Sequence, residues 1–95
     1  MTQVVYAIHD DEVTIEITGH AGFAEKGRDI VCSAISILIQ TLAAHLDNVA
    51  DRYECTLNEG YAYIYATGYE AKIAAETIMV GFYLLAENYP DYVSI

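Results

Sequence analysis

One histidine and one cysteine lie on either side of a short glycine-containing segment near the start of the chain. His20 belongs to the run TGHAG at 18–22, and Cys32 belongs to the run DIVCSAIS at 29–36. The residues between them are predicted to connect a strand to a helix, with Cys32 in the first turn of that helix. A helix start favours a negatively charged sulfur, and a thiolate near an imidazole is the minimum that nucleophilic catalysis needs.

These residues also have structural interpretations. A free cysteine is often a small core residue, and a histidine between glycines is often an exposed turn residue. Asp29 is predicted to cap the helix, which alone explains an aspartate there, although it could also orient His20. Ser36 lies one turn after Cys32 on the same face, where it either contacts the site or fills a gap. Cys55 falls inside a predicted strand and is assigned to packing.

The periodicity of apolar residues predicts the elements that must position this pair. Residues 12–18 alternate apolar and polar side chains, which is typical of a half-buried strand. The same reasoning predicts strands at 3–9, 12–18, 52–58, 61–67 and 92–95, and helices at 30–47 and 69–88. The order ββαββαβ predicts a single α+β domain over residues 1–95, with two helices packed on an antiparallel or mixed sheet.

Both predicted helices are strongly apolar. In the first, the residues at helical spacing are Ile30, Ala34, Ile37, Leu38 and Leu42. Val31, Ile35 and Leu46 widen the apolar face, so this helix is expected to be largely buried. The second helix has apolar residues on more than one side: Ile73, Ile78, Met79, Val80, Phe82, Leu84 and Leu85. A small sheet cannot cover all of these, so a homodimer is expected.

Composition restricts the function classes. The net charge is −10, from 14 acidic and 4 basic residues without a Lys/Arg cluster, which argues against nucleic acid as a partner. No signal peptide is recognised and no apolar stretch is expected to span a membrane, so we expect a cytoplasmic protein with reduced cysteines. The chain lacks the paired Cys/His spacings of structural zinc sites. We therefore expect neither a metal nor a cofactor.

The two runs around His20 and Cys32 are specific enough to resemble a known family. The segments 18–22 and 27–36 closely resemble the corresponding motifs of the ribosomal-processing cysteine protease family, Prp. The closing run YPDYV at 89–93 is similar to the end of that family's chains. The departures are mild: Ser33 stands where alanine is common, and Phe23 stands where other aromatic residues occur.

The resemblance implies a definite activity. Members remove an N-terminal extension from a basic large-subunit ribosomal protein, cutting after an aromatic residue, and they are small cytosolic homodimers. Their catalytic His/Cys pair falls here on His20 and Cys32. The segment that accommodates substrate falls on residues 21–28, where we single out four residues: Ala21, Gly22, Phe23 and Gly27.

In the reaction that this implies, Cys32 attacks the scissile carbonyl and His20 holds the proton and returns it to the leaving amine. Backbone N–H groups around Ser33 are candidates for holding the oxyanion. The alternative from another class is an acidic, dimeric module that binds a basic ribosomal protein without cutting it. A third hypothesis, a thiol redox protein, is weaker than these two because the chain has no C-x-x-C motif.

Overall fold

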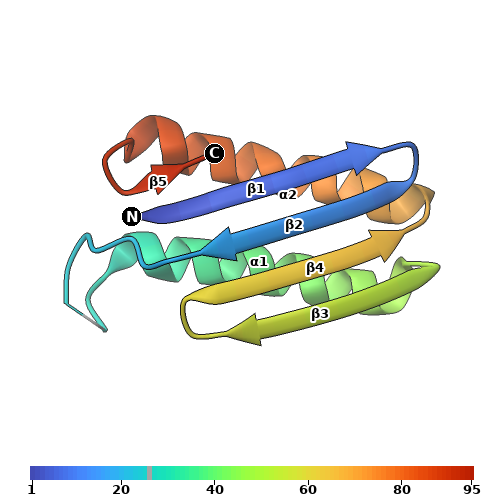
Figure 1. The fold of residues 1–95 in the computed structure, drawn as a ribbon, viewed down its shortest axis with the longest axis horizontal. Coiled ribbons are helices and arrows are strands. Elements are labelled where there is room, and N and C mark those ends of the chain that lie inside the picture. Colours follow the sequence, from blue (N-terminus) through green and yellow to red (C-terminus); the bar gives the residue numbers. More distant parts are fainter. Residues whose placement is uncertain (26) are drawn as a thin grey trace.

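The chain folds into the predicted order of five strands and two helices (Figure 1). The computed structural model describes residues 1–25 and 27–95. The elements are β1 (Thr2–His9), β2 (Glu12–Thr18), α1 (Ile30–Val49), β3 (Arg52–Asn58), β4 (Tyr61–Thr67), α2 (Tyr69–Asn88) and β5 (Val93–Ser94). The predicted bounds differ from these at the start of β1, the end of α1 and both ends of β5.

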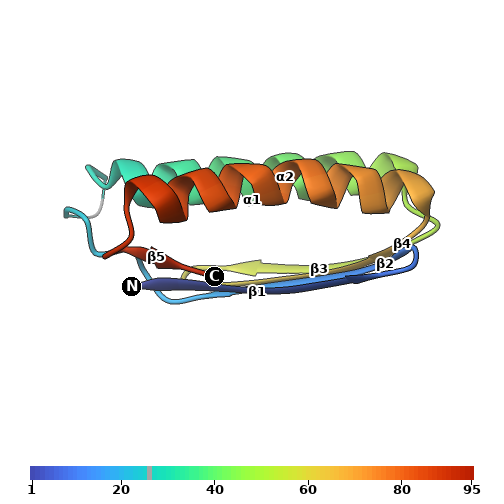
Figure 2. The same ribbon diagram turned by 90° about the horizontal axis from the view of Figure 1, so that it is seen from above.

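The strands form one mixed sheet in the order β3-β4-β2-β1-β5. The short β5 pairs with β1 in parallel, whereas the other neighbouring strands are antiparallel. Both helices lie on the same face of this sheet, which gives a two-layer α+β fold (Figure 2). The predicted fold class is therefore confirmed.

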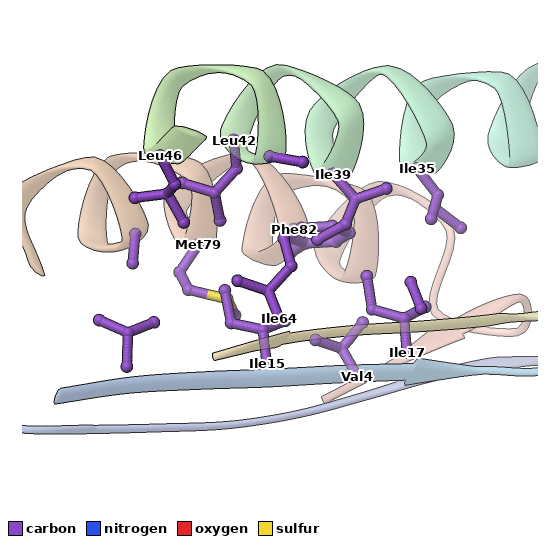
Figure 3. Close-up of a cluster of buried hydrophobic side chains, with 14 of the residues drawn as sticks. Val4, Ile15, Ile17, Ile35, Ile39, Leu42, Leu46, Ile64, Met79 and Phe82 are labelled. Carbon is purple, nitrogen blue, oxygen red and sulfur yellow. The ribbon is translucent and has the colours of Figure 1, made fainter. Parts of the chain in front are cut away.

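The core lies between the sheet and the helices (Figure 3). Alternate residues of the central strands point into it, and the register places Ile15 of β2 opposite Ile64 of β4. Both side chains are fully buried, and Phe82 of α2 and Leu42 of α1 cover them from the helical layer. The opposite face of the sheet remains open, and the tyrosines of β4 lie on it, alternating with the buried small residues and Ile64.

Helix α1 begins after its cap residue, Asp29, and buries the side that faces the sheet. Its buried residues are Val31, Ile35, Ile39, Leu42, Ala43 and Leu46. The prediction that Ile30 and Ile37 belong to the buried stripe is wrong, because these side chains are 57% and 61% exposed. The i, i+4 spacing of the residues that do pack leaves these two on the outer side of the helix.

The expectation that no apolar stretch is long enough to span a membrane is also wrong. Helix α1, with 20 residues, is long and apolar enough to do so by length and composition. In this fold, however, α1 packs one side against the sheet (Figure 2). A core helix passes the same test of length and composition, so this observation is weak evidence for a membrane span.

Helix α2 runs beside α1 and contacts it closely. A Cβ atom added to Gly81 would lie 2.8 Å from the Leu38 side chain, so the glycine permits the close approach of the two helices. The residues of α2 that are buried are Ala71, Ala75, Met79 and Phe82. Ile73, Val80 and Leu84 are exposed, so a substantial part of the apolar surface of α2 faces away from the core.

Candidate active site

Three segments meet at one end of the sheet and enclose a cleft of about 940 Å³. They are the connection between β2 and α1, the first turns of α1, and the turn between β3 and β4 (Figure 1). Both His20 and Cys32 line this cleft. The fold thus brings together the two residues that the sequence analysis selected for chemistry.

Cys32 lies in the first turn of α1, where its side chain is half-buried at the wall of the cleft. Its position follows from the cap, because the side chain of Asp29 accepts the backbone N–H of Cys32 at 2.9 Å. The sulfur is a free thiol. Helix α1 therefore fixes the position of Cys32, and the cap residue determines where that helix begins.

Asp29 ties the loop to the helix start. Its side chain is buried, with 7% of the residue exposed, and Oδ2 accepts the backbone N–H of Phe23 at 3.0 Å while Oδ1 bonds Cys32. Burial would raise the pKa of this carboxyl, but hydrogen bonds from the backbone and side chain of Cys32 and from the backbone of Phe23 hold the pKa below its ordinary value. Of the two roles that the sequence left open, the structure shows capping rather than a bond to His20.

His20 is exposed at the mouth of the cleft, and its imidazole lies against Gly60 in the β3–β4 turn. A Cβ atom on Gly60 would lie 2.8 Å from Nε2 of His20. The backbone is joined at the same place, because the N–H of Gly19 donates to the carbonyl of Gly60 at 2.9 Å. The β3–β4 turn therefore lies against the Nε2 end of the His20 ring.

The four residues expected to form a substrate loop separate into two groups. Gly22 and Gly27 line the cleft, and both have positive φ angles. Ala21 is buried in the core, and the ring of Phe23 packs edge-on against Tyr89 and Tyr92 at centroid distances of 5.6 and 5.2 Å. Residue 26 of the same loop lies outside the described residues.

The serines after Cys32 have different environments. Ser33 donates its side-chain hydroxyl and its backbone N–H to the carbonyl of Asp29, both at 3.1 Å. The N–H groups of Cys32 and Ser33 are thus engaged by Asp29 in this structure. The role of N–H groups around Ser33 in holding an oxyanion stays a prediction. Ser36, one turn further along, is exposed and lines the cleft.

Cys55 lies apart from this chemistry. It is a half-buried free thiol on the inner side of β3, packed against the core. The cleft lining includes Cys32 and not Cys55. Across residues 1–25 and 27–95, no cluster of three His, Cys, Asp or Glu side chains is arranged to hold a metal ion.

Comparison with protein families decides which family this chain belongs to. Residues 1–94 match the model of the family described as Cysteine protease Prp. The chain belongs to the Prp family. It is a cysteine protease, and the resemblance first noted at His20 and Cys32 extends over almost the whole chain.

Solved structures show the same fold. The chain is similar to the ribosomal processing protease Prp from S. aureus in complex with a covalently linked product peptide, at a TM-score of 0.84 and 22% identity, covering 98% of this chain and 95% of that one. The same protease with a substrate peptide matches at a TM-score of 0.78 and 22% identity over the same shares of both chains.

A second organism contributes a further match. The protein SMU.848 from Streptococcus mutans is 29% identical at a TM-score of 0.73, with 99% of this chain and 91% of that chain covered. Comparison with curated proteins returned no match. The ββαββαβ architecture is therefore that of Prp structures.

One wall of the cleft was not predicted from the sequence. This wall comes from the end of β3 and the following turn, and includes Leu57, Asn58 and Gly60. The sequence pattern of these residues indicates only the end of a strand and a hairpin turn, and nothing in it points to a role in the site. Their place in the site depends on the packing of β3 and β4 beside α1, which local patterns do not reveal.

Proposed function

We propose that this Prp-family protease removes the N-terminal extension of a bacterial large-subunit ribosomal protein and cuts after an aromatic residue. The observation that carries the proposal is the shared cleft of His20 and Cys32 in a chain that matches the family over residues 1–94. The S. aureus protein of the same fold is described as a ribosomal processing protease and has been solved with a substrate peptide, which supports the choice of substrate.

In the proposed reaction, His20 takes the proton of the Cys32 thiol, and the sulfur attacks the carbonyl carbon of the scissile bond. The tetrahedral adduct collapses when His20 returns the proton to the leaving amine, which leaves a thioester on Cys32. His20 then takes a proton from water, and the resulting hydroxide attacks the thioester. The carboxylate product leaves and the thiol is restored.

His20 has a clear task in this scheme because the helix start is already occupied. The carboxylate of Asp29 caps α1 by accepting a hydrogen bond from the backbone N–H of Cys32. A negative charge therefore already interacts with the N-terminal end of the helix. We assign the proton transfer to His20 and the placement of Cys32 to Asp29.

The aromatic preference is supported by the character of the cleft wall. Ile37 of α1 and Leu57 of β3 both line the cleft, and both expose a large part of their apolar side chains. An aromatic side chain gains much of its binding free energy by burying surface against such residues. Ser36 and Asn58 supply polar groups in the same lining, and we assign them to contacts with the substrate backbone.

The oligomeric state and cellular location form part of the same proposal. The exposed apolar residues of α2 support a homodimer, and the net charge of −10 favours a basic protein partner over nucleic acid. We propose a cytoplasmic enzyme that requires no cofactor, since a thiol and an imidazole complete the peptide-bond chemistry.

The test is to incubate the purified protein with the extended ribosomal protein and to measure product masses. We expect a product shortened at its N-terminus, with the new end directly after an aromatic residue. Cys32→Ala should abolish cleavage, and the matched variant Cys55→Ser should retain it. Cleavage by Cys32→Ala, or an intact substrate after prolonged incubation with the parent protein, would contradict the proposal.

A further inference from the structure

We propose that Gly60 is a positioning residue for His20, because the imidazole occupies the space that a side chain at position 60 would need. The inference rests on the proposed function, in which His20 is the general base. Its basis is a contact between two segments that are distant in the chain. It concerns the geometry of the catalytic pair rather than the identity of the substrate.

The register of the sheet creates the contact. Strands β2 and β4 are antiparallel, and their pairing places Thr18 opposite Tyr61. The next step outward brings Gly19 beside Gly60, where the N–H of Gly19 donates to the carbonyl of Gly60 at 2.9 Å. The residue before His20 is therefore hydrogen-bonded to the same turn that its ring contacts.

The ring contact is too close for any side chain at position 60. An ideal Cβ on Gly60 would lie 2.8 Å from Nε2, 3.3 Å from Cε1 and 3.6 Å from Cδ2 of His20. Carbon atoms do not approach ring atoms as closely as the first of these distances, so either the imidazole or the turn would have to move. Gly60 also has a φ of +75°, which favours glycine on its own account.

None of the other glycines that line the cleft has its Cβ position against the His20 ring, and a Cβ on Gly19 would instead lie 2.5 Å from the carbonyl oxygen of Met1. Gly22 and Gly27 also have positive φ angles, but a Cβ on either would meet no described atom within 4 Å. Backbone conformation alone therefore explains a glycine at those positions. At Gly60 the conformation favours glycine, and a Cβ would in addition displace the His20 ring from its place in this structure.

The contact matters because His20 is exposed and has few other restraints. The turn lies against the Nε2 end of the imidazole and restricts the positions that the ring can take in the cleft that also contains Cys32. Displacing a reacting group by about 1 Å can cost roughly 100-fold in rate. A methyl group at position 60 would force a displacement that approaches this scale.

The first experiment measures kcat and KM for Gly60→Ala, Gly60→Asn and Gly68→Ala on the extended ribosomal protein. Both substitutions of Gly60 add a Cβ, but asparagine tolerates a positive φ, so it separates the ring contact from backbone strain. Gly68 has a φ of +124° and lies at the start of α2, where its N–H donates to the carbonyl of Asp11 in the β1–β2 turn, whereas His20 follows the other end of β2. Gly68→Ala is therefore a control for strain away from the site.

We expect both Gly60 variants to lose roughly 10- to 100-fold in kcat with little change in KM. Gly68→Ala should lose stability but retain kcat and KM. Should Gly60→Ala fail to fold, Gly60→Asn decides the question by itself. Parental kcat in Gly60→Asn would overturn the proposal, since the added Cβ would then have no effect on the base.

The second experiment needs no substrate and so stands apart from the proposed function. The rate of Cys32 alkylation by iodoacetamide is followed against pH in a Cys55→Ser background. The rate reports the fraction of Cys32 present as thiolate, and this fraction depends on the position of His20 and on Asp29 and Glu59, the other charged groups in the described lining. We expect both Gly60 variants to shift the profile and Gly68→Ala to leave it unchanged.

Gly60 variants with a lowered kcat but an unchanged pH profile of Cys32 alkylation would overturn the positioning role. The turn would then act on the substrate rather than on His20. Absence of ribosomal protein cleavage by the parent would instead contradict the proposed function. In that case the alkylation profile still decides whether Gly60 positions His20.

Discussion

Asp29 shows how one side chain can organise a site without reacting. Its two carboxylate oxygens accept hydrogen bonds from two different segments. Oδ1 accepts the backbone N–H of Cys32 at the helix start, and Oδ2 accepts the backbone N–H of Phe23 in the loop. A neutral amide of the same shape has one oxygen and one N–H₂ group. It can therefore satisfy one of these two backbone donors and not both.

We accordingly expect Asp29→Asn to keep the cap of α1 and to release the loop. The lost hydrogen bond should cost about 1–2 kcal/mol of stability. Hydrogen exchange should become faster at the amide of Phe23, while the amides of α1 remain protected. Equal protection of Phe23 in both proteins would show that Phe23 is held by its ring contacts with Tyr89 and Tyr92 rather than by Asp29.

The lowered pKa of Asp29 predicts how this stabilisation depends on pH. The unfolded chain binds a proton at this carboxyl more readily than the folded protein, so the contribution is complete above about pH 4. It is lost as the pH falls through the lower, folded-state value. The difference in unfolding free energy between the parent and Asp29→Asn, measured by urea titration, should therefore narrow below about pH 4. A constant difference down to pH values near 2 would contradict this explanation.

At the scale of elements, the edge strand β3 contributes one wall of the cleft. Leu57 lines the cleft with its apolar side chain, and the neighbouring Thr56 points to the open face of the sheet. The two positions thus offer a substitution inside the cleft and a matched one outside it, on the same strand.

We expect Leu57→Lys to lower kcat/KM by roughly 10-fold or more, because an aromatic side chain of the substrate loses its apolar contact and meets a charge. Thr56→Lys should leave kcat/KM close to the parental value. The comparison is made with an aromatic-containing peptide and a control peptide with alanine at that position. A similar loss for both peptides would show that Leu57 does not contribute to aromatic recognition.

At the scale of the whole molecule, the helical layer has an apolar outer surface. Val80 on α2 is 59% exposed, and Val5 on the open face of β1 is 57% exposed, so two equally accessible valines lie on opposite faces of the molecule. If α2 forms the dimer interface, a charged side chain in place of Val80 should disrupt association, whereas one in place of Val5 should not.

Light scattering at micromolar concentration should give about twice the mass of one chain for the parent and for Val5→Glu. Val80→Glu should give the mass of one chain. A dimer that survives Val80→Glu and is lost in Val5→Glu would place the interface on the sheet instead, and a monomeric parent would exclude a homodimer at that concentration.

The net charge of −10 acts over the whole molecule and on the encounter with a basic substrate. Salt shortens the range of this attraction to about 10 Å at 0.1 M. We therefore expect kcat/KM for the full-length ribosomal protein to fall as salt rises. A short neutral peptide with the same cleavage site should show a much flatter dependence. Parallel declines for both substrates would show that salt acts on the catalytic pair or on association instead.

The sequence alone determined the elements and singled out the candidate pair, His20 and Cys32, since the signals for both are local. Alternation in β2 and β4 predicted the strands, and Asp29 marked the start of α1 because a helix needs a cap at that point. His20 and Cys32 were conspicuous because neither the apolar periodicity nor a turn requires them. Such signals involve neighbouring residues, which share the same segment whatever the remainder of the chain does.

Only the tertiary structure decided what each of these residues touches. The contact of His20 with Gly60 follows from the register of β2 against β4, which no local pattern encodes. Phe23 packs on Tyr89 and Tyr92 because β5 brings the end of the chain back beside β1, next to the loop. Likewise, the sheet covers one side of α1, so Ile30 and Ile37 are exposed although their spacing is as regular as that of the buried residues. These are contacts between distant segments, and their geometry exists only once the strands have paired and the helices have docked.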